Sequence, residues 1–308
     1  MENDKLVITS SPHIFDDDSV EKIMYGVIIA LLPASIMGVY YFGLHALLLI
    51  VTCVITAVLT EALFQKARNY PVTIKDGSAV ITGLLLALNL PPGLPAWMAV
   101  VGTVVAIILG KQIFGGLGHN PFNPALVGRA FLVASFPVAM TTWLSPVDAT
   151  TTATPLGLMK LEGIPTDYWS LFIGKIGGTI GETSALAILI GAGYLLYKGY
   201  IDWRIPLSYI GTVAVLTTVF GRDPIFHIFA GGLMLGAFFM ATDMVTTPIT
   251  KKGRWIFGIG AGILVVVIRL WGGYPEGASY SILLMNGITP LLNRYTRPRV
   301  FGEVKKNA

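Results

Sequence analysis

The sequence predicts an all-α polytopic membrane protein of about ten transmembrane helices, arranged as two inverted five-helix repeats. Of its 308 residues, 54% are apolar and only 12% are charged, which is about half of the roughly 25% that a soluble domain carries. The apolar residues fall in repeated runs of a length that crosses a bilayer. This composition excludes a soluble enzyme, and it excludes an intrinsically disordered chain because such chains are poor in hydrophobic residues.

Ten apolar runs define the predicted spans. In chain order they are 24–42, 44–64, 78–92, 96–114, 125–140, 183–198, 206–220, 225–242, 255–271 and 277–293. The third span is short and ends in Asn89-Leu90-Pro91-Pro92. Short spans that proline or glycine interrupts are typical of broken helices that line a site.

The positive charges predict the orientation, since an even number of spans places both chain ends on one side. If that side is the cytoplasm, all but four of the 21 lysines and arginines lie inside, Lys111 and Arg129 among them. The four exceptions are Lys160, Lys175, Arg222 and Arg269. Such an excess is the positive-inside signal. We therefore expect a multi-pass protein of the cell (inner) membrane with both termini cytoplasmic and the loop around Thr154 extracytoplasmic.

The spans also divide the chain into regions. These are a cytoplasmic segment 1–23, a first five-helix half 24–140, an external loop 141–182, a second five-helix half 183–293 and a basic cytoplasmic tail 294–308. Two short matches relate the halves, because 82–91 resembles 239–248 and 114–117 resembles 271–274. With five spans in each half, equivalent helices run in opposite directions, as in transporters and channels that build a site near the midplane.

The cysteine and histidine content limits the cofactors. Cys53 is the single cysteine, and the four histidines are scattered, so the chain is predicted to hold no iron–sulfur cluster, no attached haem and no metal ion. Any redox cofactor would therefore be organic. The net charge of +4 reflects cytoplasmic loops in a membrane protein, and no nucleic-acid partner is expected.

A threonine-rich segment lies in the external loop and reads Asp148-Ala149-Thr150-Thr151-Thr152-Ala153-Thr154-Pro155-Leu156. Pro155 favours an extended conformation at Thr154, which would present the Thr154 hydroxyl outward. The alternative is an ordinary polar turn whose hydroxyls bond to the backbone.

A glycine-rich turn separates the fourth and fifth spans and reads Gly115-Gly116-Leu117-Gly118-His119-Asn120-Pro121-Phe122-Asn123-Pro124. Asn-Pro occurs twice in it, so a continuous helix is excluded, and irregular backbone at membrane depth must line a cavity or be buried in protein. The Asn120 and Asn123 amides suit the polar edge of a flavin or quinone ring. Alternatively, they cap the fifth span.

Three further groups carry charge. Asp76 and Asp243 lie at related positions in the two halves, where they could carry a cation or proton or simply cap helix ends. Arg222 is one of few external cations and would pair either with a flavin phosphate or with Asp223 or Glu276.

Taken in order, these motifs resemble the RnfD/NqrB family, the integral membrane subunits of sodium- or proton-motive electron-transfer complexes. The motifs are Asp76-Gly77, Thr82-Gly83, Asn89-Leu90-Pro91-Pro92, the Asn-Pro-Phe-Asn-Pro turn, the threonine-rich segment, Arg222-Asp223-Pro224 and 272–277. The resemblance implies a urea-transporter-like fold, in accord with two inverted halves. Only segment 1–23 precedes the first span, which favours the RnfD branch, found in ferredoxin:NAD oxidoreductase complexes.

The resemblance also implies a covalent flavin. Asp148, Thr151, Ala153 and Thr154 match the signature Asp-Gly-x-Ser/Thr-Gly-Ala-Thr, in which a flavin transferase joins FMN to the last threonine through a phosphoester. Ala149 and Thr152 replace the two glycines of that signature. Thr154 is the expected attachment site. A second, non-covalent riboflavin is often implied, and the Asn120/Asn123 turn is its candidate position.

The resemblance finally implies a subunit that passes electrons across the membrane between ferredoxin-side and NAD-side subunits, coupled to Na⁺ or H⁺ transport. The chain has no dinucleotide-binding glycine fingerprint after a strand, so iron–sulfur, NAD-binding and second flavin subunits are expected partners, and no catalytic residue is assigned to this chain alone. Two alternatives stay open: a quinone-reducing subunit like NqrB, and a urea-like channel or transporter without redox function.

Overall fold

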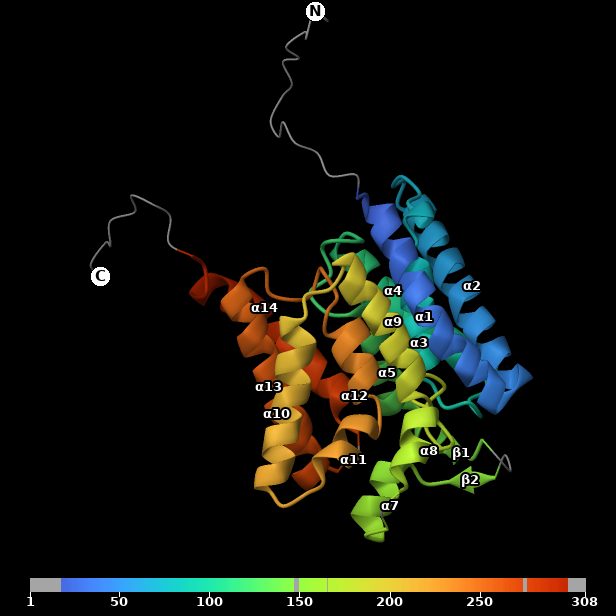
Figure 1. Ribbon diagram of the computed structural model, residues 1–308. Coiled ribbons are helices and arrows are strands. Elements are labelled where there is room, and N and C mark those ends of the chain that lie inside the picture. The colour runs from blue at the N-terminus through green and yellow to red at the C-terminus, as the bar shows by residue number, and fades with distance from the viewer. Residues whose placement is uncertain (1–17, 147–149, 165, 274–275, 299–308) are drawn as a thin grey trace, which may run out of the picture.

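The computed structural model describes residues 18–146, 150–164, 166–273 and 276–298, and it is helical apart from one pair of two-residue strands (Figure 1). Four helical stretches are long and apolar enough to cross a membrane: α1 (Val20–Phe42), α2 (Leu44–Ala67), Ala96–Phe114 and α13 (Lys251–Trp271). Shorter apolar helices are α3 (Ser78–Leu88), α5 (Pro124–Ser135), α9 (Ala185–Lys198) and α10 (Arg204–Val219). The prediction of a polytopic all-helical membrane protein is confirmed.

The outer surfaces of the long helices fit this conclusion. Ile29, Ile36, Leu59 and Leu63 on α1 and α2 are each more than half exposed. A contiguous apolar surface of this kind would make a soluble monomer aggregate, whereas in a bilayer it contacts the lipid chains. The apolar core beneath includes Leu86, with no exposed surface.

Local sequence signals set several helix ends. Gly43 separates α1 from α2 and has a φ of 71°, a left-handed conformation that glycine adopts without steric cost. Asn123 precedes α5 as its N-cap, accepting from the backbone N–H groups of Ala125 and Leu126, with Pro124 at the first helical position. Ser184 and Thr250 cap α9 and α13 in the same way.

Two predicted spans are broken. The sequence predicts one helix over 225–242, but the structure has α11 (Pro224–Phe229), α12 (Leu233–Leu235) and the π-helical turn η3 (Gly236–Met240). The break falls at Gly231, whose φ is 70° and therefore lies outside the helical region. The run 125–140 is likewise divided into α5 and α6 (Pro137–Thr141), because Pro137 has no N–H to continue the helical bonding.

The packing of the first half of the chain is repeated in the second half. In the first half α2 packs on α4 (Ala96–Ile108) and on the short α3, and α4 packs on α5. In the second half α10 packs on α13 and on α11, and α13 packs on α14 (Ala278–Tyr295). The halves meet where α1 contacts α9 and where α5 contacts α14. In each contact between the halves a helix therefore packs on the helix at the same place in the packing order of the other half, as at the axis of a two-fold arrangement.

The connection between the halves is more structured than the loop that the sequence predicts. Strands β1 (Trp143–Leu144) and β2 (Thr151–Thr152) pair antiparallel, and two short helices follow, α7 (Pro155–Leu161) and α8 (Tyr168–Ile173). These elements lie at the end of the molecule opposite to the start of α1 and the end of α14 (Figure 1). They form a separate layer at that end of the bundle.

Candidate cofactor cleft and buried charge clusters

Thr154 stands directly before α7 and caps it. Its backbone is extended (φ −66°, ψ 156°), as the following proline predicts. Its Oγ1 accepts a hydrogen bond from the Gly157 N–H at 3.1 Å, and the residue is only 4% exposed. The expected extended backbone is confirmed, but the hydroxyl serves as a helix cap and does not project into open solvent.

A cleft of about 640 Å³ opens beside this threonine. Its walls include Arg129, Trp143, Thr151, Thr154, Glu276 and Tyr280. Its volume falls within the roughly 300–1,000 Å³ of small-molecule sites. Thr151 and Thr154, predicted from the threonine-rich segment, thus share one cleft, whereas Asp148 lies outside the described residues.

One wall of the cleft leads to a buried group of charges that we name the Arg129 cluster: Arg129, Glu182 and Glu276. Arg129 Nη1 donates to Asn89 Oδ1 at 2.7 Å, and Nη2 donates to Glu276 Oε2. Glu182 Oε1 lies 3.8 Å from Arg129 Nη1. Arg129, counted among the cytoplasmic positive charges, is therefore buried in the protein, where two carboxylates and an amide contact it. Glu276 pairs with Arg129 and not with Arg222.

The Arg129 cluster is incompletely hydrogen-bonded. Glu182 Oε1, Glu276 Oε1 and the Thr179 hydroxyl are buried and have no hydrogen-bond partner among the described residues. The nearby Arg269 guanidinium donates to the backbone carbonyls of His227, Ala230 and Glu276, so it does not fill this gap. An unsatisfied buried polar atom costs about 1–3 kcal/mol.

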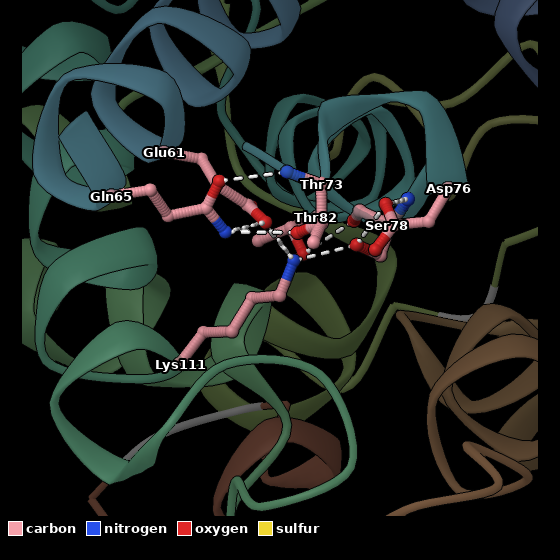
Figure 2. A network of polar contacts seen from close by, with 7 residues as sticks. All are labelled: Glu61, Gln65, Thr73, Asp76, Ser78, Thr82 and Lys111. Carbon is pink, nitrogen blue, oxygen red and sulfur yellow. Dashed lines mark hydrogen bonds and ion pairs between the residues drawn. The ribbon is translucent and has the colours of Figure 1, made fainter. Parts of the chain in front are cut away.

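A second buried group, the Lys111 cluster, comprises Glu61, Ser78, Asp76 and Lys111 (Figure 2). Lys111 Nζ donates to both carboxylate oxygens of Glu61, at 2.9 and 2.7 Å, and to Ser78 Oγ at 2.6 Å. Ser78 Oγ in turn donates to Asp76 Oδ1 at 2.6 Å. Glu61 and Lys111 are 0% and 1% exposed. Lys111, also counted among the cytoplasmic positive charges, is therefore buried within the helix bundle and paired with Glu61.

Beside the Lys111 cluster lies a smaller cavity between the two halves. It has a volume of about 90 Å³, and Ser78, Lys111, Asn120, Asn123, Thr242 and Asp243 are among the residues that line it. This volume is far below that of the first cleft. The residues predicted to hold a second flavin, Asn120 and Asn123, thus line one cavity between the halves.

The polar side chains of that turn are already used locally. Asn123 Oδ1 caps α5, and Asn123 Nδ2 donates to the Met240 carbonyl at 3.5 Å. Asn120 Nδ2 donates to the Phe122 carbonyl at 3.1 Å. The turn therefore fastens the start of α5 to η3 in the other half.

Each of the two predicted coupling aspartates has local partners. Asp76 Oδ1 accepts from the Ser78 N–H at 2.9 Å. Asp243 accepts from the Val245 N–H at 3.3 Å and from the Thr246 hydroxyl at 3.1 Å. Asp76 thus contacts the first residue of α3, as the capping alternative predicts, whereas Asp243 bonds within the turn that follows η3 and also lines the cavity between the halves.

Comparison with known proteins identifies the family. The model of the NQR2, RnfD, RnfE family matches residues 7–302. The chain belongs to the NQR2, RnfD, RnfE family. This confirms the family predicted from the motifs.

Relatives within the NQR2, RnfD, RnfE family match almost the whole chain. The chain is 53% identical to the D subunit of the proton-translocating ferredoxin:NAD(+) oxidoreductase complex of Clostridium ljungdahlii, over 96% of both chains. It is also 53% identical to the D subunit of the Na(+)-translocating complex of Acetobacterium woodii, over 98% of both. With the D subunit of the ion-translocating oxidoreductase complex of Citrobacter koseri it shares 39% identity, over 96% of this chain and 98% of the other.

Sequence reasoning missed the charge pairs of this family member. Glu61, Lys111 and Arg129 all lie inside predicted spans, where an ionisable residue is by default a functional candidate with a nearby partner. The presence of an ionisable residue in a predicted span could have singled out each of the three. The sequence does not show the partner of each residue, because the paired positions are 50 residues apart for Lys111 and Glu61 and 147 apart for Arg129 and Glu276.

Proposed function

We propose that this chain is the flavin-carrying membrane subunit of an ion-translocating ferredoxin:NAD⁺ oxidoreductase complex. In this role it passes electrons across the membrane between ferredoxin-side and NAD-side subunits, coupled to Na⁺ or H⁺ transport. The observation that carries the proposal is the match to D subunits over 96–98% of the chain. Two relatives with equal identity are named for different ions, so overall similarity does not select the ion.

The proposed cofactor is FMN joined to Thr154 through a phosphoester. The cleft beside Thr154 supports it, because its volume suits a small-molecule cofactor and Thr151, Thr152 and Thr154 of the motif line it. Bound FMN supplies the redox chemistry, while the protein binds and orients it. Within the cleft, Trp143 and Tyr280 offer aromatic surface, and Arg129 brings positive charge to one wall.

The proposed architecture is a pair of inverted five-helix repeats of the urea-transporter type. The repeated packing order supports it, and so does the broken third element of each half, α3 with its proline turn and α11 with α12 and η3. We assign the start of α1 and the end of α14 to the cytoplasmic face, and the layer of β1, β2, α7 and α8, where Thr154 caps α7, to the outer face. The two lie at opposite ends of the molecule (Figure 1).

The proposed partners are the lipid bilayer, the iron–sulfur, NAD-binding and second flavin subunits of the complex, and the transferase that attaches FMN. The names of the relatives as complex subunits support this set. The exposed apolar surfaces of α1 and α2 are available for contact with both lipid and other membrane subunits.

We propose that Asp76 and Asp243 couple ion transport to electron transfer. Asp243 lines the cavity between the halves, and Asp76 is linked to that cavity through Ser78. In reconstituted complex, replacing both by asparagine is expected to abolish ion transport while the flavin is still reduced. Unchanged transport with normal flavin reduction would exclude both residues.

The experiment for the cofactor is in-gel fluorescence of denatured protein, co-expressed with its flavin transferase. Wild type is expected to fluoresce, Thr154→Ala is expected not to, and Thr151→Ala serves as the matched control in the same cleft. Fluorescence that survives Thr154→Ala would move the attachment to Thr151 or Thr152. A colourless wild type, with the transferase shown to be active on another substrate, would refute the flavin proposal and favour a channel without redox function.

A further inference from the structure

We infer that Glu182 and Glu276, which contact the same Arg129 guanidinium, form a carboxyl pair beside the Thr154 cleft that holds one proton in exchange with the water of the cleft. The pair is distinct from the aspartates proposed for ion coupling, which lie at the other cavity. Its residues come from different regions, since Glu182 lies two residues before the N-cap of α9 and Glu276 directly precedes the N-cap of α14.

The geometry leaves one oxygen of each carboxyl without a donor. Glu276 Oε2 accepts from Arg129 Nη2, but Glu276 Oε1 and Glu182 Oε1 have no hydrogen-bond partner among the residues that the structure describes. The Glu182 side chain is only 2% exposed, so bulk water does not compensate. The buried Thr179 hydroxyl is a donor that can satisfy one oxygen of Glu182, and a hydrogen carried by one of the two carboxyls supplies a further donor.

The charged groups facing Glu182 are Glu276, Arg129 on α5 and Arg269 on α13. Glu276 disfavours ionisation of Glu182 in this buried site, which opposes the effect of the two guanidinium groups and favours one proton on the pair. In the described part of the chain, no three His, Cys, Asp or Glu side chains are placed to hold a metal ion.

Glycines keep the carboxyl of Glu182 in place. A Cβ built on Gly232 would lie 2.6 Å from Glu182 Oε1, so only glycine leaves room for the carboxyl there, and a Cβ on Gly178 would lie 3.4 Å from Glu182 Oε2. Glu182 is therefore held in a fitted site, with its unpartnered oxygen against the Gly232 backbone.

The pair is placed to balance charge in the cleft. Glu276 lines the cleft together with Thr154, so a proton can pass between the cleft water and the pair by forming and breaking one carboxyl O–H bond. In a site of low dielectric, negative charge added nearby favours uptake of a proton. This role in charge balance rests on the proposed function, in which an iron–sulfur partner supplies the electron to the FMN.

The test uses infrared spectroscopy of the Thr154→Ala chain, which carries no flavin in this proposal and isolates the protein groups. At about pH 6 an ordinary glutamate with a pKa near 4.3 is ionised, so a protonated carboxyl C=O band that shifts in D₂O reports the pair. We expect this band in the parent chain, its loss in Glu182→Gln, and its retention in Glu162→Gln, where an exposed glutamate after α7 is changed. Folding is checked by the circular dichroism of each variant.

Two results would overturn the inference. One is a parent chain without a protonated carboxyl band, which would mean that both groups are ionised and bridged by water. The other is a band that survives Glu182→Gln and Glu276→Gln alike, which would assign it to another acid. As a second readout, the midpoint potential of the flavin in the Thr154 chain is expected to depend less steeply on pH after Glu182→Gln. If no flavin attaches at all, the proposed function fails while the infrared result still decides the carboxyl pair.

Discussion

The Lys111 cluster and the Arg129 cluster are both buried and both combine carboxylates with a cation, but they differ in how fully their polar atoms are bonded. All three N–H groups of Lys111 have an oxygen partner, and both oxygens of Glu61 accept one of them. Around Arg129, by contrast, one oxygen of each carboxyl has no donor among the described residues. We call the Lys111 cluster closed because these polar atoms are all bonded. We call the Arg129 cluster open because it can bind one more ligand.

This difference indicates which buried charges stabilise the fold and which can react. A buried ion pair with every group satisfied resists change, because breaking it leaves an uncompensated charge. A cluster that lacks one donor can accept a proton without breaking an existing bond. The open cluster also borders the cleft of about 640 Å³, whereas the closed cluster borders a cavity of about 90 Å³. Flavin chemistry is therefore expected at the Thr154 cleft, and the Glu61–Lys111 ion pair is expected to be rigid.

Removing the cation of the closed cluster should have the largest effect on stability. Lys111→Met leaves the buried Glu61 carboxylate without its cation, which costs about 3–5 kcal/mol in comparable sites. The double variant Lys111→Met/Glu61→Gln is expected to recover much of this loss, because neither charge is then left alone. Thermal unfolding in detergent micelles measures both.

The control for this prediction is Lys198→Met, since Lys198 lies in the last turn of α9 and is exposed. It is expected to change stability by less than about 0.5 kcal/mol. If Lys111→Met were as mild as Lys198→Met, the Lys111 cluster would not be closed, and its contrast with the Arg129 cluster would disappear.

A smaller effect is expected from crowding Glu182. Gly232→Ala would bring a Cβ within 2.6 Å of Glu182 Oε1, and overpacking of this kind costs about 1–3 kcal/mol. Gly178→Ala approaches the same carboxyl at 3.4 Å, an ordinary contact, and should be nearly neutral. The measurement is again unfolding in micelles, together with the position of the carboxyl band. Equal effects of the two variants would show that Glu182 is loosely held.

The sequence predicted the parts of this molecule that depend on local pattern. Apolar runs located α1, α2 and α13, because a helix in lipid must be apolar over its whole length. The broken third span followed from Asn89 and the two prolines after it. The extended backbone of Thr154 followed from the proline after it. Each of these features is encoded in contiguous sequence.

The features that the sequence did not predict depend on contacts between distant residues. Gly231 breaks the eighth predicted span, yet glycine within an apolar run is common in membrane helices and does not announce a break. Counting positive charges gives no partner for Arg129, although Asn89, Glu182 and Glu276 surround it. Which carboxylate meets which cation is decided by helix packing.

The smallest expected effect comes from a third charge cluster that is only partly buried. Asp202 lies between α9 and α10 and contacts Arg204 and Arg254. Burial raises the pKa of Asp202, but hydrogen bonds from the Arg204 backbone N–H and from the Arg254 and Arg204 guanidinium groups lower it by more, so the net shift is downward.

Because the pKa of Asp202 is lower in the folded chain than in the unfolded one, its stabilisation is present above the unfolded pKa of about 3.9 and is lost as the pH falls through the folded pKa. Asp202→Asn should therefore cost at most about 1 kcal/mol at about pH 7, since the arginines are partly solvated, and the cost should disappear in strong acid. The measurement compares unfolding of both chains at the two pH values. A cost that persisted in acid would mean that Asp202 acts through its hydrogen bonds alone and not through its charge. A cost as large as that of Lys111→Met would show that burial is not what distinguishes the closed cluster from a surface ion pair.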